Sequence, residues 1–423
     1  MMRIPVRYLR WGVFALFLSC ASRSAPAQSP LNWEQVKTRF RAANPTLLAG
    51  QINIQESKAQ EITAYLRPNP NITATVDQVD PFSGNPYRPF GYALPLVSFD
   101  YLHERQHKRE LRLESAQKAT AIAESQQVDL ERTLLFNLRT AFVQTLQAKQ
   151  VLALAKDNLE YFDHELSISR DRFKAGDIAR VDLDRIELQR VQYQSDYETA
   201  TVNLRTAKIT MLTLLSDRTP VDQFDITGPF DFSDKLLPLD EFHTEALASR
   251  PDLKAAVQAV GKAQTDHKLA VANGSVDPTF SVDFARNPPI PIYLGASVSI
   301  PLRIFDRNQG EKARTEIDIH HAERMREATQ NQIFSDVDSA YVTLASTINL
   351  LLAYRGAEGY LARATSVRET ISFSYQHGGA ALVDFLDAQR DYRAVRLAYI
   401  NLIGSYLTAA GQLNLAVGRE MIL

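Results

Sequence analysis

Long stretches of the chain place apolar residues at helical spacing and lack the residues that usually end a helix. Positions 104–175 contain neither Gly nor Pro, and Leu130, Leu134, Leu138 and Ala141 recur every three or four residues. At about 1.5 Å per residue, such a helix would be about 105 Å long. Taken alone, it is best explained as an ordinary coiled coil, but no compact domain of this size needs such a rod.

Four shorter segments alternate apolar and polar residues instead. They form two predicted strand pairs, about 71–99 (71–80 with 90–99) and about 279–304 (279–286 with 292–304). In the first pair Ile72 alternates with Thr73, and in the second Phe280 alternates with Ser281. Strands near ten residues with this alternation suit a transmembrane sheet, although a half-buried soluble sheet has the same pattern.

The order of these elements occurs twice, at an offset of about 202 to 206 residues. The matches are Asn44-Pro-Thr-Leu47 with Arg250-Pro-Asp-Leu253, Leu94-Pro-Leu96 with Ile300-Pro-Leu302, Phe99-Asp100 with Phe305-Asp306, Arg172-Phe-Lys-Ala-Gly176 with Ser374-Tyr-Gln-His-Gly378, and Val181-Asp182 with Val383-Asp384. We therefore predict a duplicated protomer of very long helices and four strands. The first repeat covers 28–216 with long helices about 104–175 and 180–215. A linker covers 217–245, and the second repeat covers 246–423 with long helices about 310–377 and 382–417.

The N-terminal residues 1–27 have the form of a signal peptide. Basic residues precede an apolar stretch that is too short to span a bilayer. Ala25-Pro-Ala27 fits a small-x-small cleavage site, and Cys20, in a loose lipobox, is the alternative as a lipid-accepting residue. Beyond this segment no run of 18 apolar residues occurs, so the sequence predicts no membrane-spanning helix.

Charge and residue content exclude several classes of function. The chain has 47 Lys and Arg against 49 Asp and Glu, for a net charge of −2, which gives no electrostatic footprint for nucleic acid. Cys20 is the only cysteine, so no disulfide is expected in the mature protein. No arrangement of residues predicts a catalytic site, a cofactor site or a metal site, and we expect a protein that is not an enzyme.

If the strands enter a membrane, the chain must form an oligomer. Four strands cannot close around a passage, and an open sheet edge in lipid leaves backbone groups unpaired at several kcal/mol each. Two copies would give an eight-stranded barrel, whose interior is filled by side chains. Three copies would give a twelve-stranded barrel, which leaves a channel. A passage therefore favours a trimer with closed symmetry.

Several motifs together resemble the TolC outer-membrane efflux family. Residues 375–389, which begin Tyr375-Gln-His-Gly378, are similar to its turn and inner pore helix. Residues 300–310 resemble its second strand-to-helix junction, especially in its metal and solvent-resistance branch. The resemblance implies a homotrimer in the Gram-negative outer membrane with a twelve-stranded barrel and a periplasmic α-helical tunnel. It also implies docking on a membrane-fusion adaptor joined to an inner-membrane pump, with 217–245 in an equatorial belt.

The same resemblance assigns roles to residues near the periplasmic end. Asp384 and Asp387 match the acidic ring of the pore aperture, although residues at this spacing alone would be read as solvated aspartates at a helix start. Asp182 and Tyr375 match positions that hold the entrance closed, so we expect a hydrogen bond between them. The third, usually basic, member of that set is Ala380 here, so one salt bridge of the family is missing.

The turns at this end are the expected adaptor-docking tips. Gly176, Gly378 and Gly379 permit sharp turns. Arg172 and Phe173 are the expected contact side chains beside them.

The expected function is a passive exit duct of a tripartite efflux system for drugs, solvents or metal ions. A type I protein secretion channel is an alternative, because the pump and not the duct selects the cargo. A periplasmic coiled-coil scaffold without a pore is the alternative from a different class.

Overall fold

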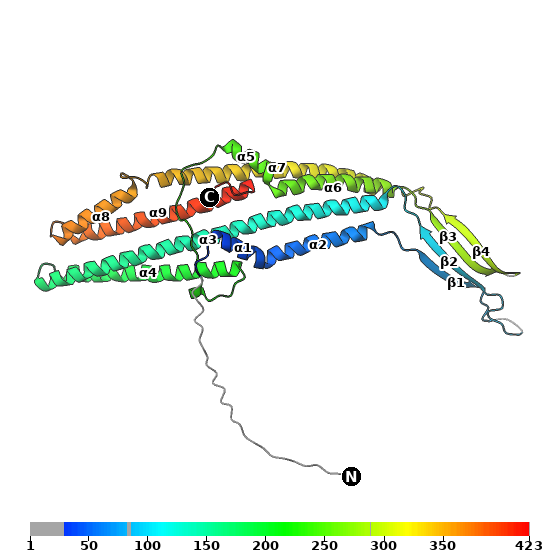
Figure 1. The fold of residues 1–423 in the computed structure, drawn as a ribbon, viewed down its shortest axis with the longest axis horizontal. Helices are drawn as coiled ribbons and strands as arrows, with labels where there is room; N and C mark the ends of the chain where they lie inside the picture. Colours follow the sequence, from blue (N-terminus) through cyan, green and yellow to red (C-terminus); the bar gives the residue numbers. More distant parts are fainter. Residues whose placement is uncertain (1–28, 83–85, 288, 423) are drawn as a thin grey trace, which may run out of the picture.

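The computed structural model describes residues 29–82, 86–287 and 289–422. The protomer is elongated, with helices along most of its length and the strands together at one end (Figure 1). The predicted signal peptide 1–27, including Cys20, lies outside the described residues. Within the described ranges, no helix combines the length and the apolar content needed to span a membrane.

The strands form one antiparallel sheet in the order β1-β2-β3-β4. They are β1 (Asn71–Asp77), β2 (Leu94–Leu102), β3 (Thr279–Asn287) and β4 (Ile290–Ser299). β2 pairs with β3, with Leu96 opposite Ala285 and Leu102 opposite Thr279. The two strand pairs predicted from the sequence are therefore joined side by side, and this pairing connects the two halves of the chain.

Four helices belong to the described part of the first half. They are α1 (Trp33–Ala43), α2 (Pro45–Tyr65), α3 (Lys108–Ala175) and α4 (Arg180–Leu214). α1 starts at a capping box in which the Asn32 side chain accepts from the backbone N–H of Gln35 and the Gln35 side chain accepts from that of Asn32. α2 starts at Pro45, after Asn44. α3 has 68 residues and is about 100 Å long.

The described part of the second half contains five helices and departs from the sequence prediction in its longest helix. They are α5 (Leu239–Ser249), α6 (Pro251–Asn273), α7 (Gln309–Leu352), α8 (Tyr360–Gln376) and α9 (Leu382–Val417). The prediction of one continuous helix over about 310–377 is wrong, because α7 ends at Leu352 and α8 begins at Tyr360. Gly356 has φ +90°, and a Cβ on Gly359 would lie 2.5 Å from the Arg355 carbonyl oxygen. The left-handed φ favours glycine at Gly356, and the close carbonyl favours it at Gly359, which caps the start of α8.

The segment between α4 and α5 crosses the helices near the middle of the molecule (Figure 1). It contains a short 3₁₀ helix, η1 (Val221–Gln223), and a parallel β-bridge between Leu31 and Ile226. The Tyr406 hydroxyl accepts a hydrogen bond from the Ser233 backbone N–H at 3.2 Å, which ties the segment to α9. The segment and α1 therefore attach to the outside of the long helices at mid-length.

The apolar core is divided along the rod. One cluster joins α5, α7 and α9, and a second joins α1, α3 and the end of α4. A third lies near the helical tips, where Phe162 contacts Tyr193 and Phe385 with ring centroids 4.7 and 6.4 Å apart. α3 contacts α2 and α6 toward the sheet, and α4 and α9 toward the tips. It is thus the common neighbour of both halves.

Candidate functional site

One face of the sheet is apolar across all four strands. Ile72 lies opposite Phe99, Phe99 opposite Val282, and Val282 opposite Ala296. Their side chains are open in the protomer, with 74% of Ile72, 46% of Phe99 and 47% of Val282 exposed. A continuous exposed apolar face of this kind is typical of strands that face lipid.

The opposite face is polar. Ser98 lies opposite Asp283, and Asp100 lies opposite Ser281, which in turn lies opposite Ser297. The Asp100 carboxylate accepts hydrogen bonds from the Ser281 hydroxyl at 2.5 Å and from the Ser98 hydroxyl at 3.2 Å. Sequence reasoning did not single out Asp100 as functional, although an aspartate within an alternating apolar strand was the available signal. A curved sheet with this face inward would have a polar, acidic lining.

Both outer edges of the sheet are open. Among the described residues, β1 pairs only with β2 and β4 pairs only with β3. Backbone N–H and C=O groups along these edges need partners if the sheet lies in lipid. The protomer therefore presents a sheet that strands from other copies can complete.

The far end of the molecule has two helical turns. Gly176 ends α3 with φ +85°, and its N–H donates to the Phe173 carbonyl at 3.0 Å. Gly378 has φ +76°, and its N–H donates to the Tyr375 carbonyl at 3.1 Å. Gly379 does not have a positive φ, and a Cβ there would meet Ser374 at an ordinary 3.5 Å. The left-handed conformation thus requires glycine at Gly176 and Gly378, and not at Gly379.

The other two predicted tip residues contact their own protomer. Arg172 donates to the Tyr375 carbonyl at 3.1 Å, and its guanidinium lies 5.1 Å from the centroid of the Tyr375 ring. Phe173 packs on the core cluster near the tips, and the Arg180 guanidinium lies 5.8 Å from its ring centroid. Arg172 therefore connects α3 to α8.

Asp384 and Asp387 are exposed on one face at the start of α9. The Asp384 carboxylate accepts from the Ala381 backbone N–H at 3.3 Å, which satisfies part of the helix start. Asp387 forms an ion pair with Arg390 at 3.1 Å. The arrangement leaves both carboxylates accessible, with Asp387 partly neutralised by its neighbour.

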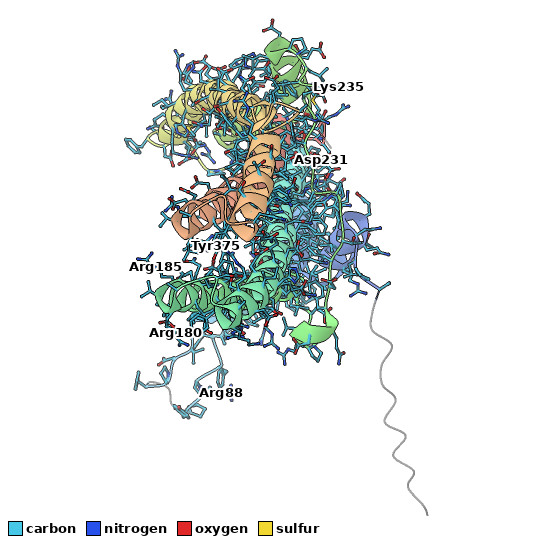
Figure 2. The ribbon with its side chains drawn as sticks, turned by 90° about the vertical axis from the view of Figure 1, so that its left-hand side faces the viewer. Arg88, Arg180, Arg185, Asp231, Lys235 and Tyr375 are labelled. Atoms are coloured by element: carbon cyan, nitrogen blue, oxygen red, sulfur yellow. The ribbon has the colours of Figure 1, made fainter. Side chains whose placement is uncertain are left out.

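Asp182 and Tyr375 are not hydrogen-bonded to each other within the described part of the protomer. The Tyr375 ring is stacked on Phe385 at 4.9 Å, and its enclosed hydroxyl makes no hydrogen bond of good geometry there. Burial raises the pKa of the Tyr375 phenol, while the Ser169 hydroxyl and the Arg172 charge act to lower it. Figure 2, viewed along the molecule from the tips, shows Tyr375 where the α8–α9 hairpin meets α3. The expected bond is thus absent within the described part of the protomer.

A polar seam that sequence reasoning missed joins α3 to α8 and α9 just above the tips. We define it as Tyr161, Glu165, Ser372, Gln376 and Gln389. The Tyr161 hydroxyl donates to the Ser372 hydroxyl at 2.9 Å, and the Gln389 amide donates to Tyr161 at 3.2 Å and to Ser372 at 3.1 Å. The Gln376 amide donates to the Glu165 carboxylate at 2.9 Å. Glu165 and Gln389 are buried, so these hydrogen bonds lie away from water.

Comparisons with known proteins agree with this geometry. Residues 243–419 match the family model described as "Outer membrane efflux protein". The cobalt-zinc-cadmium resistance protein CzcC of Cupriavidus metallidurans is 21% identical over 93% of this chain and 91% of its own length. The outer membrane protein TolC of Escherichia coli is 22% identical over 71% of this chain and 64% of its own. A crystal structure of CusC superposes with a TM-score of 0.76 at 17% identity, covering 92% of both chains.

The second half of the chain is thus similar to outer membrane efflux proteins, and the whole protomer shares the fold of CusC. The fold predicted from the sequence, long helices with a small four-stranded sheet, is confirmed at the level of the protomer. TolC is described as an outer membrane protein, and the CusC structures are described in terms of transmembrane channel formation. Among the described residues no group of three or more His, Cys, Asp or Glu side chains could hold a metal ion.

Proposed function

We propose that three copies of this chain form the outer-membrane exit duct of a tripartite efflux system. The observation that carries the proposal is the sheet, which has an apolar outer face, a polar face lined by Asp100 and Asp283, and two open edges. Pairing β4 of each copy with β1 of the next satisfies all edges, and three copies contribute twelve strands. The two repeats, 28–216 and 246–423, then alternate around the tunnel, with the linker 217–245 in an outer belt.

The aperture of this duct lies at the helical tips. Three copies of Asp384 and Asp387 would gather six carboxylates at the entrance, which attract cations and repel anions. The ion pair between Asp387 and Arg390 reduces the charge of the ring, so Asp384 contributes more of the field. The polar seam and the Arg172 contact to Tyr375 hold the two hairpins of each protomer together when the entrance is closed.

A membrane-fusion adaptor docks on the tips in this proposal, and an inner-membrane pump supplies the energy. The exposed turns at Gly176, Gly378 and Gly379 are the docking points. Arg172 and Phe173 are half-buried in their own protomer and shape the turns while also bordering the adaptor. The duct itself performs no chemical reaction.

The proposed cargo includes divalent metal ions. Support comes from the similarity to CzcC, which is described as a cobalt-zinc-cadmium resistance protein and aligns over nearly the whole chain. An acidic lining and entrance suit cations, and a duct needs no tight metal site. Drugs or organic solvents are the other cargo classes that such a duct carries, and a secreted protein is the alternative if the partner is a type I secretion pump.

The proposal is tested by deleting the gene and measuring growth in cobalt, zinc and cadmium. We expect the deletion strain to be more sensitive to these metals. The intact gene should restore tolerance, whereas a gene encoding Val282→Arg, on the lipid face, should restore it poorly. Unchanged metal tolerance together with increased sensitivity to dyes or solvents would show that the cargo is not metal ions, and would leave the proposed duct intact. A monomeric protein found free in the periplasm would instead support the scaffold alternative.

A further inference from the structure

A cavity of about 650 Å³ lies where α1, α3 and the C-terminal part of α9 meet. Its walls come from both repeats and from the segment that links them. Most of the wall is apolar, and its large members are Trp33, Leu135, Phe136, Phe142, Leu407 and Ile422. This size and lining are typical of sites for small molecules.

The charged groups around the cavity are nearly all paired. The lining has five basic side chains and three acidic ones. Lys37 pairs with Glu34 at 2.9 Å and Arg41 with Glu131 at 2.7 Å. The other two paired bases use acids outside the lining: Arg132 binds Asp129 at 2.6 Å, and Arg419 binds Glu245 at 2.8 Å.

Among the described basic side chains that line the cavity, Arg139 is the one without an ion pair. It forms no ion pair and no hydrogen bond there, and its guanidinium lies 4.8 Å from the centroid of the Trp33 ring. Burial lowers the pKa of Arg139, and Glu420 and Glu34 act from a distance to raise it. Those two carboxylates are both bound to Lys37, at 3.8 and 2.9 Å. An arginine keeps its charge, so Arg139 lines the cavity as a cation whose N–H donors have no partner among the described residues.

We propose that this cavity binds an amphipathic carboxylate with an acyl or aromatic body. The carboxylate pairs with Arg139, whose planar guanidinium offers two parallel donors to a planar acceptor. The apolar body lies along Phe136, Phe142 and Leu407. One chain supplies the whole site, so each protomer binds one molecule, independently of the cargo that passes through the duct.

The position of the site indicates what the ligand does. Trp33 belongs to α1 and Ile422 to the segment after α9, and both line the cavity, with Trp33 against Arg139 of α3. An ion pair at 3.8 Å between Lys37 and Glu420 links these two segments. A bound carboxylate would add a bridge from Arg139 to this closure and stabilise the outer belt against the long helices.

The chain contains a useful reporter, because Trp33 lines the cavity and Trp11, its other tryptophan, lies in the predicted signal peptide. The full-length processed protein in phosphatidylcholine nanodiscs is titrated with 11-(dansylamino)undecanoic acid, and energy transfer from Trp33 to the dansyl group is recorded. We expect saturation at one probe per protomer. The corresponding undecanamide, which lacks the charge, should bind about tenfold more weakly or worse.

Variants assign the binding to Arg139. Arg139→Gln should weaken the acid by about tenfold to a hundredfold, the range of a lost charge-assisted hydrogen bond, and should leave the amide unaffected. Arg139→Lys keeps the charge and should retain most of the affinity. Arg324→Gln is the matched control, because Arg324 is an exposed α7 residue that pairs with Glu327 away from the cavity.

Equal affinity of the acid for the wild type and a folded Arg139→Gln variant would overturn the proposal. Equal affinity of the wild type for the acid and the amide would overturn it as well, and this comparison needs no variant. Thermal melting and oligomer migration of each variant report whether it is folded. Growth of the same strains in metal salts separately tests the duct, so failure of one proposal is distinguishable from failure of the other.

Discussion

Replacing Gln389 by leucine tests whether the polar seam holds the entrance closed. Gln389 is only 4% exposed, and its amide donates to both the Tyr161 and Ser372 hydroxyls. Leucine has a similar volume and no donor, so the change removes two hydrogen bonds and creates little cavity. At about 0.5–1.5 kcal/mol each, the loss is about 1–3 kcal/mol per protomer.

The consequence depends on whether these bonds break when the entrance opens. If they do, the full loss acts on the closed state alone and shifts the equilibrium toward the open state by about 5- to 150-fold per protomer. The assay is single-channel recording of the purified protein in a planar bilayer, with the open probability and conductance as the readouts. We expect the Gln389→Leu channel to spend far more time in a high-conductance state.

The matched control is Gln192→Leu on α4. Gln192 is exposed and donates only to Asp196 of the same helix, at 2.9 Å. This variant should behave like the wild type. A folded Gln389→Leu channel with the wild-type open probability would show that the seam does not break on opening, and the reasoning about closure would be refuted.

Three further predictions follow from particular positions. Gly378→Ala should destabilise the tip by about 1–2 kcal/mol, because φ at Gly378 is +76°, whereas Gly379→Ala should be nearly neutral. Thermal melting compares the two variants, and equal losses of stability would contradict the assignment of the glycine requirement to Gly378. Val282→Arg places a charge on the lipid face and should lower the stability of the folded barrel by about 2–4 kcal/mol near the bilayer midplane. The measurement is the amount of folded protein in outer-membrane fractions. Wild-type amounts would place Val282 away from lipid. Burial acts to raise the pKa of Asp252, but the hydrogen bond and charge of Arg250 lower it below the usual 3.8. The Asp252 carboxylate therefore contributes its full stability above about pH 4, and this contribution is lost as pH falls through the lowered pKa. Thermal melting against pH should show this loss of stability, and Arg250→Gln should make the loss smaller.

The duplicated order of the elements was readable from the sequence because helical and strand periodicities are local properties. The start of β2 was less readable: it begins at Leu94 and not near position 90, because the Gly91 N–H donates to the Arg88 carbonyl in a turn. The break between α7 and α8 had a signal in Gly356 and Gly359, and the strength of the helical pattern around them concealed it. The left-handed φ at Gly356 and the close carbonyl at Gly359 explain why glycine occupies both positions between the two helices.

The seam and the cavity were not predictable, because each depends on contacts between distant parts of the chain. Tyr161 and Gln389 are 228 positions apart, and nothing near either residue indicates its partner. Arg139 is one of many arginines in the sequence, and its lack of an ion pair is visible only when the acids around the cavity are paired with other bases. Asp384 and Asp387, in contrast, came from family resemblance, and the protomer adds the Arg390 partner that the sequence did not suggest.

The central claim is that the open sheet edges are completed by other copies of this chain to form a conducting duct. The most direct measurement takes protein extracted from outer membranes, determines its mass by light scattering with correction for detergent, and records its conductance in a planar bilayer. The account predicts a particle of three protomers that conducts ions with a preference for cations, a preference that Asp384→Asn reduces. A monomeric or non-conducting particle that is otherwise folded would contradict it.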